Sequence, residues 1–495
     1  MSKCFPSEFP DASGSLSRRH HGLSRLPLSA WACAGVLGFL ALGREPAPAA
    51  EVALMSLPSS VKVASAPDRP WTDKKTRTLA DLPAIPVDEK GSRFGGTQVK
   101  SGTPSGFFRT SKLEGRWWLV DPDGYLFVHR GVTSVNETRT KAAGESLIRQ
   151  FGSRESWAES TSELLKDNGF NGLGAWCDEK VLQPASTGLV YTKLWNFMSS
   201  YGRSRRGTSQ GSGHTKYTNG CPFIFDPEFA AFCDERAKAL KASKEDPWLL
   251  GHFTDNELPW SIEMLERYLE LPENEAGYVE AWRWLRERHG AKAEKSDITK
   301  RDRAEFVGHA ADTYFSIVSR AIRKYDPNHL ILGSRFHGRA LRIPELFEAA
   351  GRHIDVISVN YYHAWSPDQD RLASWSKSSG KPIIISEWYA KAMDSGLTNT
   401  GGVGWLVKTQ ADRAAFYQNF TLGLLESKSC IGWHWFRYSD NDPDQKGVDP
   451  SNRDSNKGIV TSHYKPYEPL LNSMKELNLR TLGIVRHFDR NQASD

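Results

Sequence analysis

Residues 248–260 read WLLGHFTDNELPW, a short apolar run that opens onto the carboxylate of Glu257. Residues 382–388 read PIIISEW, and this run ends in the same way on Glu387. A buried carboxylate costs free energy unless it is paired or used in chemistry. Two apolar strands that each finish on an acid beside aromatic residues therefore predict two carboxylates facing one cleft.

Strand and helix signals alternate on both sides of these runs. Strands are expected at residues 131–135, 170–176, 190–197, 248–254, 330–335, 354–361, 382–387 and 431–436, and helices at 156–168, 227–243, 303–325, 409–425 and 467–477. Such alternation indicates parallel strands. It favours an α/β fold, a (β/α)8 TIM barrel, over a doubly wound open sheet, because no Gly-rich phosphate loop follows any strand. Barrel enzymes carry their reactive groups at the C-terminal strand ends, where both glutamates fall.

The chain divides into five expected parts. Residues 1–50 resemble a signal peptide, with basic residues before an apolar stretch at 26–42 and small residues near Ala50, although a membrane anchor is the alternative. This predicts a secreted or periplasmic protein without stable membrane association. The other parts are a low-complexity arm at 51–93, a β-hairpin extension at 94–130, the barrel at 131–480 and a C-terminal tail at 481–495.

Charge and cysteine content exclude several kinds of partner. The formal net charge is +5, and no basic run is interleaved with aromatic residues, so nucleic acid is not expected to bind. The mild positive charge tolerates an anionic polysaccharide without requiring one. Cysteine spacing matches no zinc pattern, so neither a metal nor a cofactor is expected. Cys221 and Cys233 could form a disulfide or remain free.

Strands four and seven lie on opposite sides of an eight-stranded barrel, so their tips face each other. Carboxyl groups about 5–5.5 Å apart are typical of a retaining glycosidase. Glu387 would then attack the anomeric carbon, and Glu257 would act as acid and base. These roles require a raised pKa for Glu257 and an ionised Glu387.

These residues resemble the signature of the clan A retaining glycoside hydrolases, which have Asn-Glu on strand four and Glu on strand seven. The resemblance implies that Asn256 holds the substrate 2-hydroxyl and that Tyr361 or Tyr362 contacts the nucleophile. The chain is also similar to the β-agarases of glycoside hydrolase family 50 and related agarase-like proteins, through residues 106–109, 117–124, 255–260, 385–387, 434–440 and 456–460.

The chain departs from that pattern just after Glu387 and at Arg437, where glutamine is expected. These departures concern the cleft, so they bear on agarose as substrate more than on glycosidase chemistry. Arg437, Lys391 and Arg335 could serve a sulfated galactan, or they could be ordinary ion-pairing residues on the rim.

Further substrate-binding candidates follow the ends of the predicted strands. Aromatic faces suit sugar rings, and a core position is the alternative for each aromatic residue. Polar candidates at the same ends would contact sugar hydroxyl groups, or have no role. His252 and Asp255 are expected to be structural. The candidates are Trp260, Arg335, His337, Asn360, Tyr361, Tyr362, His363, Trp388, Trp433 and Trp435.

The sequence therefore predicts a secreted retaining β-glycosidase that hydrolyses β-galactosidic bonds of a red-algal, agarose-like galactan. A β-galactosidase, porphyranase or mannanase of the same clan is the alternative within the enzyme class. A catalytically inactive barrel that binds polysaccharide is the alternative outside it. In each case the partner is a polysaccharide or oligosaccharide, and the oligomeric state stays open.

Overall fold

The computed structural model describes residues 54–491 except residues 90 and 212. These residues form one compact unit. The predicted signal peptide at 1–50 lies outside the described residues. Within the described part of the chain, no helix is long and apolar enough to cross a membrane.

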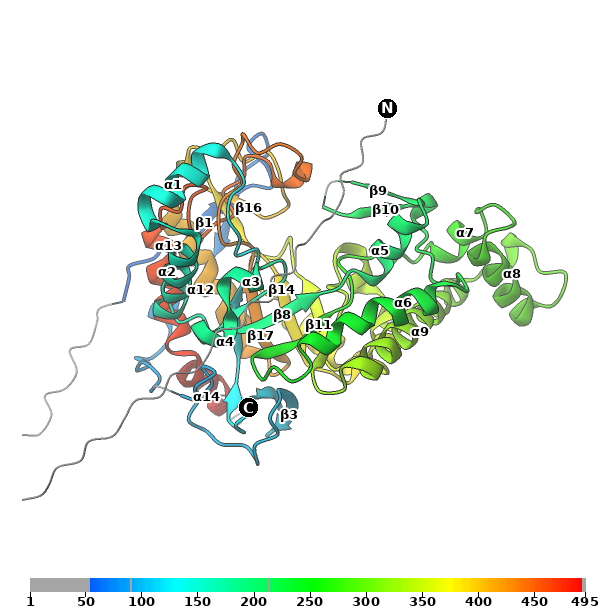
Figure 1. Ribbon diagram of the computed structural model, residues 1–495, viewed down its shortest axis with the longest axis horizontal. Helices are drawn as coiled ribbons and strands as arrows, with labels where there is room; N and C mark the ends of the chain where they lie inside the picture. The colour runs from blue at the N-terminus through cyan, green and yellow to red at the C-terminus, as the bar shows by residue number, and fades with distance from the viewer. Residues whose placement is uncertain (1–53, 90, 212, 492–495) are drawn as a thin grey trace, which may run out of the picture. The chain divides into compact units, whose positions relative to one another are not determined.

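Eight parallel strands form the predicted barrel, which is nearly closed (Figure 1). Their order is β12-β11-β8-β7-β6-β17-β14-β13, and a parallel bridge from Phe336 to Val359 joins the last strand to the first. Buried side chains fill most of their length, as expected for parallel strands covered on both faces. The strands are β6 (His129–Val132), β7 (Gly172–Leu173), β8 (Val190–Leu194), β11 (Leu249–Phe253), β12 (Leu330–Gly333), β13 (Ile357–Asn360), β14 (Ile383–Glu387) and β17 (Cys430–Trp435).

Helices cover the outside of the barrel. The five predicted ones correspond to α2 (Arg154–Asp167), α6 (Phe229–Ala237), α9 (Lys300–Tyr325), α12 (Gln410–Glu426) and α13 (Glu468–Asn478). Both α9 and α12 begin at a capping box, formed by a Thr and an Asp three residues later. The sequence did not predict α1 (Lys141–Phe151), α10 (Pro344–Gly351) and α11 (Gln369–Ser379).

A small antiparallel sheet precedes the barrel, as the hairpin prediction at 94–130 anticipated. It contains β3 (Arg109–Leu113), β4 (Arg116–Val120) and β5 (Leu126–Phe127). Its Phe108, Leu119 and Phe127 share one hydrophobic cluster with Leu250 and Ile384 of the barrel strands. This sheet therefore packs against apolar side chains of the barrel strands, and the C-terminal ends of those strands remain open for the site.

Two segments that were expected to be an arm and a tail contain regular secondary structure. The arm at 51–93 contains a hairpin, β1 (Ser60–Val63) and β2 (Thr72–Lys75), which reaches β16 (Trp405–Val407) through a bridge from Ala64 to Leu406. The tail at 481–495 contains α14 (Thr481–Asn491), which buries Ile484 and Phe488. Short amphipathic elements near the ends of a chain have too few residues to show a clear hydrophobic periodicity, so the sequence does not predict them.

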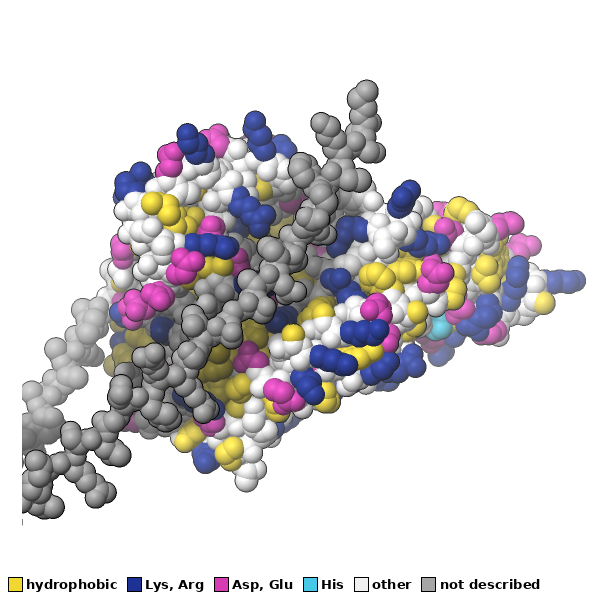
Figure 2. All heavy atoms as spheres, in the orientation of Figure 1, with side chains coloured by type: hydrophobic (Ala, Val, Ile, Leu, Met, Phe, Trp, Pro, Cys, Tyr) yellow, Lys and Arg dark blue, Asp and Glu magenta, His cyan; other side chains and the backbone are white. Residues whose placement is uncertain are grey.

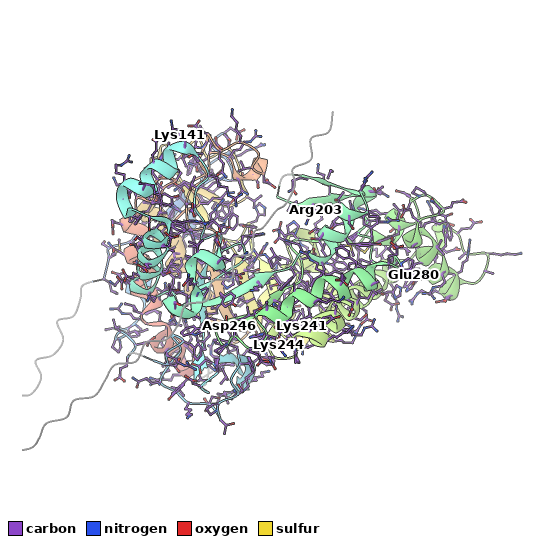
Figure 3. All side chains as sticks on the ribbon, viewed as in Figure 1. Lys141, Arg203, Lys241, Lys244, Asp246 and Glu280 are labelled. Atoms are coloured by element: carbon purple, nitrogen blue, oxygen red, sulfur yellow. The ribbon has the colours of Figure 1, made fainter. Side chains whose placement is uncertain are left out.

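The charged segment at 261–300 contains two helices. It forms α7 (Met264–Tyr268) and α8 (Ala276–His289). Glu280 of α8, labelled in Figure 3, lies 2.6 Å from His309 Nε2 and so fixes α8 to α9. On the face drawn in Figure 2, basic and acidic side chains are interspersed. Cys221 and Cys233 are buried free thiols, so the possible disulfide is absent.

Candidate active site

The C-terminal ends of the barrel strands carry an unusual set of backbone conformations. Ser134, Trp176, Glu257, Arg335 and His363 all have φ between 51° and 61°. Non-glycine residues adopt this left-handed conformation at a cost of about 1–3 kcal/mol, and such strain gathers at functional sites. All five residues follow barrel strands, so the strained backbone marks the mouth of the barrel.

The segment that presents Glu257 is fixed by the buried Asp255. Its carboxylate accepts hydrogen bonds from the backbone N–H groups of Met198 at 2.8 Å and Ser199 at 3.0 Å, and from the Tyr314 hydroxyl at 2.7 Å. Burial nevertheless raises the pKa of Asp255 to about 6. The structural role expected for Asp255 agrees with these contacts, which join β11 to α5 (Phe197–Ser204) and α9.

Glu257 has three polar neighbours. His214 Nδ1 lies 2.6 Å from Glu257 Oε2, and Asn360 donates to Oε1 at 2.8 Å. Burial alone would raise the pKa of Glu257, but His214, the charge of His337 and the Asn360 hydrogen bond together lower it. The same contact with Glu257 raises the pKa of His214.

Glu387 is held from two sides. Tyr362 donates its hydroxyl to Glu387 Oε2 at 2.6 Å, and Arg335 donates Nη2 to Oε1. Arg335 also donates Nε to Asn256 Oδ1 at 2.8 Å, so one guanidinium connects the two strand ends. Burial raises the pKa of Glu387, and the charge of Glu257 adds to the rise, while Arg335 and Tyr362 oppose it.

These pKa directions are the reverse of the sequence expectation, in which Glu257 alone holds the proton. In the structure, the contact between His214 and Glu257 raises the pKa of the imidazole and lowers that of the carboxyl, so a proton shared by the pair favours His214. For Glu257 to deliver a proton, it must take that proton back from His214. The pair therefore titrates as one unit.

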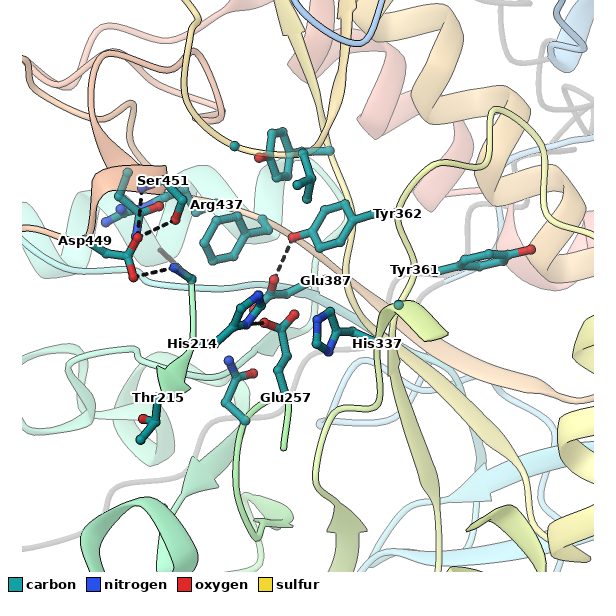
Figure 4. Close-up of a pocket in the computed structure, with 18 of the residues that line it drawn as sticks. His214, Thr215, Glu257, His337, Tyr361, Tyr362, Glu387, Arg437, Asp449 and Ser451 are labelled. Atoms are coloured by element: carbon teal, nitrogen blue, oxygen red, sulfur yellow. Dashed lines mark hydrogen bonds and ion pairs between the residues drawn. The ribbon is translucent and has the colours of Figure 1, made fainter. Parts of the chain in front are cut away.

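Both glutamates line one cavity of about 870 Å³ (Figure 4). This volume suits a small oligosaccharide rather than a single water or ion. Asn256, His337 and His363, all predicted from sequence, line the same cavity. The sequence reading missed Trp176, whose side chain is 37% exposed in the wall and which ends a predicted strand as the glutamates do.

Four predicted stacking residues are not in the cavity. Trp388, Trp433 and Trp435 are fully buried, and Trp260 is 4% exposed. The Trp388 ring stacks on Phe420 of α12 with centroids 4.4 Å apart. The prediction that these indoles bind sugar is wrong for this structure, because neighbouring side chains cover their faces.

An irregularity in the barrel sheet explains why Trp388 is buried and not exposed in the cavity. Side chains alternate between faces along a regular strand. The pairing of β13 with β14 contains a register irregularity between Val359 and Asn360, which then pairs with Glu387. Glu387 therefore reaches the cavity, and Trp388 turns outward onto α12. A sequence gives no sign of such a bulge.

The polar groups of two other candidates make their hydrogen bonds within the protein and do not face the cavity. Asn360 is buried and contacts Glu257 rather than the cavity, while its Oδ1 accepts from the Ser386 hydroxyl at 2.8 Å. Tyr361 lines the cavity, but its hydroxyl points away from the two glutamates (Figure 4) and accepts from the Asp368 backbone N–H at 3.1 Å. Of the two candidate tyrosines, Tyr362 therefore contacts Glu387.

His214 was absent from the sequence reading because its loop at 199–220 has no periodic signal. The hairpin β9 (Thr208–Gln210) and β10 (Thr215–Tyr217) delivers it to Glu257. Asp449 fixes the hairpin tip by accepting from the Gly213 backbone N–H at 2.6 Å and from Gln210 Nε2 at 3.0 Å.

Two groups of side chains could hold a metal ion, although the sequence predicted none. Within the described residues, His214, Glu257 and His337 offer ligand atoms within 4.8 Å of one another, as do His252, Asp326 and His329. The second group is buried away from the cavity. There Asp326 contacts His252 Nε2 at 2.8 Å, and Trp195 donates to His252 Nδ1, which agrees with a structural His252.

Comparisons with known proteins point to agarases. The chain is 26% identical to β-agarase B and 28% identical to β-agarase A, both of Vibrio sp. (strain JT0107), over 76% and 78% of its length. It spans about half of these relatives, 48% and 47%. No family model matches the chain.

Solved structures share the fold. BpGH50 matches with a TM-score of 0.77 at 29% identity, over 87% of this chain and 96% of that one. The agarase AgWH50C matches with a TM-score of 0.67 at 22% identity, over 80% of this chain and 66% of that one. An exo-β-agarase also matches with a TM-score of 0.67 at 22% identity, over 82% and 69%. The fold of this chain is thus also found in agarases.

Proposed function

We propose that this protein is a secreted glycoside hydrolase that cleaves β-galactosidic bonds of an agarose-like galactan with retention of configuration. The observation that carries the proposal is the placement of Glu257 and Glu387 at two strand ends facing one cavity. The β-agarase relatives support the substrate class. Opposed carboxylates with separate hydrogen-bond partners are what two-step glycoside cleavage needs.

In the first step, Glu387 attacks the anomeric carbon, and the bond from that carbon to the glycosidic oxygen breaks. Glu257 gives its proton to the departing oxygen. In the second step, Glu257 removes a proton from water, which attacks the same carbon and releases Glu387. Two inversions leave the β configuration unchanged. Arg335 and Tyr362 hold the attacking carboxylate in place.

The test uses Glu387→Gln and Glu257→Gln with agarose oligosaccharides. Loss of the nucleophile should lower kcat about 10⁴-fold or more. Glu257→Gln should still release phenol from an activated aryl β-galactoside, whose leaving group needs no proton, and azide should accelerate that turnover by replacing water in the second step. NMR of the first product should show the β anomer. An initial α anomer would refute retention, and wild-type rates in Glu387→Gln would refute the assignment itself.

The alternative of a sugar-binding barrel without activity predicts a different outcome. Both Gln variants would then bind agarose oligosaccharides as wild type does, and no reducing ends would form in any of the three proteins. The hydrogen bonds that hold both carboxylates favour the enzyme, because binding alone requires no opposed pair.

A further inference from the structure

Three basic side chains, Lys391, Lys457 and Arg437, lie close enough for their charges to interact, and the charge of Glu387 also acts on Lys457. Lys391, of β15 (Ala390–Ala392), is fully buried, Lys457 is 1% exposed, and Arg437 lines the cavity. Among the described residues none of the three forms an ion pair within 4.0 Å, and Asp454, Asp440 and Asp449 act on them only through longer-range charge. Burial of like charges without a counter-charge in direct contact is costly, so such a cluster favours a bound anion.

The contacts show how closely these groups are packed. Lys391 Nζ donates to the carbonyl oxygens of Asn399 at 3.1 Å and Gly401 at 2.8 Å. Lys457 Nζ donates to the carbonyl of Ser451 at 2.6 Å. The two ammonium groups flank Gly402, where a Cβ would come within 3.1 Å of Lys457 Nζ. Neutral carbonyls orient these ammonium groups but do not cancel their charge.

Arg437 carries an unsatisfied donor. Its Nε is buried and has no hydrogen-bond partner in the described structure. The Arg437 backbone N–H donates to the Lys457 carbonyl at 3.1 Å, so the two residues are adjacent in the same wall. Burial lowers the pKa of Lys457 to about 7, and the charges of Arg437 and Lys391 contribute.

The reactive carboxylates do not need these cations. Glu387 already has Arg335, and Glu257 already has His214. Elsewhere the cavity is also basic: Arg203, Arg339, Arg342 and Arg371 line it, against a single further carboxylate, Asp449. A cleft of this sign attracts anionic ligands.

We propose that Arg437 and Lys457 form an oxyanion subsite for a sulfate ester or carboxylate carried by a sugar unit in the cavity. The substrate would then be an acidic galactan rather than neutral agarose. This rests on the proposed function only for the saccharide part of the ligand.

The test compares three polymers made from one galactan: the sulfated form, its desulfated derivative, and the desulfated form oxidised at C6 to the carboxylate. Affinity electrophoresis of Glu387→Gln in gels containing each polymer reads binding without hydrolysis. We expect at least tenfold tighter binding to one or both acidic forms than to the neutral one, and which acidic form binds identifies the anion. Equal retardation by all three polymers would overturn the proposal.

Variants distinguish a specific anion-binding subsite from a general attraction of anions by the positive charge of the cavity. Arg437→Gln and Lys457→Gln should remove the preference, because each deletes a donor from the wall. Arg342→Gln is the matched control, since it removes one positive charge from an exposed position of the same cavity. If Arg342→Gln reduces the preference as much as Arg437→Gln, the subsite is refuted.

Inorganic sulfate distinguishes this proposal from the proposed function. Sulfate should raise the Tm of wild type and not that of Arg437→Gln. If no polymer binds but this difference is present, the sugar function fails and the oxyanion site stands. If sulfate stabilises neither protein, or both alike, the oxyanion site fails whatever the polymers show.

Discussion

Tyr361 and Tyr362 are adjacent in the sequence, but their hydroxyl groups meet different partners. Tyr362 donates to Glu387, and Tyr361 accepts from the Asp368 backbone. A hydrogen bond to a charged group contributes about 1.5–3 kcal/mol. Tyr362→Phe should therefore lower kcat/KM for galactan hydrolysis about 10- to 100-fold. Tyr361→Phe is the matched control and should leave kcat/KM within about twofold. Equal effects would contradict the placement of Tyr362 on the nucleophile.

His214 supplies a second prediction at this scale, through the pH profile. The pKa of His214 is raised above 6.5 by Glu257, so the pair keeps its proton through that pH. In His214→Gln the proton must reside on Glu257 alone, and a carboxyl group ordinarily has a lower pKa than an imidazole. The alkaline limb of kcat/KM should move to lower pH. A limb that stays in place would show that His214 does not share the proton.

Trp176 and Trp388 test which aromatic residues touch sugar. Trp176 follows β7 and has a partly exposed ring in the cavity, and Trp388 follows β14 and is packed on α12. Trp176→Ala should raise KM about tenfold with little loss of stability. Trp388→Phe should lower the free energy of unfolding by about 1–3 kcal/mol and leave KM unchanged. Denaturant unfolding and initial rates give both numbers, and the reverse pattern would restore the stacking role of Trp388.

At the scale of elements, the hairpin β9–β10 completes a set of metal-binding atoms. It brings His214 to Glu257 and His337, a His-His-Glu set typical of zinc sites. Added Zn²⁺ should inhibit by occupying the proton donor, and EDTA should reverse the inhibition. His337→Gln should weaken inhibition at least tenfold, whereas His363→Gln, elsewhere in the cavity, should not. Inhibition unchanged in His337→Gln would place the metal at another site.

The barrel strands and the two glutamates could be predicted because their signal is local. Apolar runs such as 382–386 end on an acid, and helices separate them at regular intervals. The direction in which the Trp388 side chain points could not be predicted, because it depends on the irregular pairing of Asn360 with Glu387. His214 could not be predicted either, because Asp449, from a distant loop, fixes the hairpin that carries it.

At the scale of the whole molecule, neutral histidines are buried in and around the barrel. His129, His252 and His434 are fully buried, and His434 Nε2 lies 2.8 Å from His129 Nδ1. Burial lowers the pKa of His129 to about 4 and also lowers the pKa values of His252 and His434. These imidazoles bind protons more readily in the unfolded chain, whose histidines titrate near pH 6.5.

The fold should therefore lose stability as the pH falls below about 6.5. Because the folded pKa is lower than the unfolded one, the stabilisation is complete above pH 6.5 and disappears as the pH approaches the folded value. Linkage gives a loss of about 1 kcal/mol per histidine between pH 7.5 and pH 5.5. His214 has a raised pKa and acts in the opposite direction, but its side chain is 41% exposed and contributes less. Urea unfolding at the two pH values measures the difference, and His129→Gln should reduce it. A protein equally stable at pH 5.5 and 7.5 would show that these histidines bind protons equally well in the folded and the unfolded chain, and would refute the lowered pKa values.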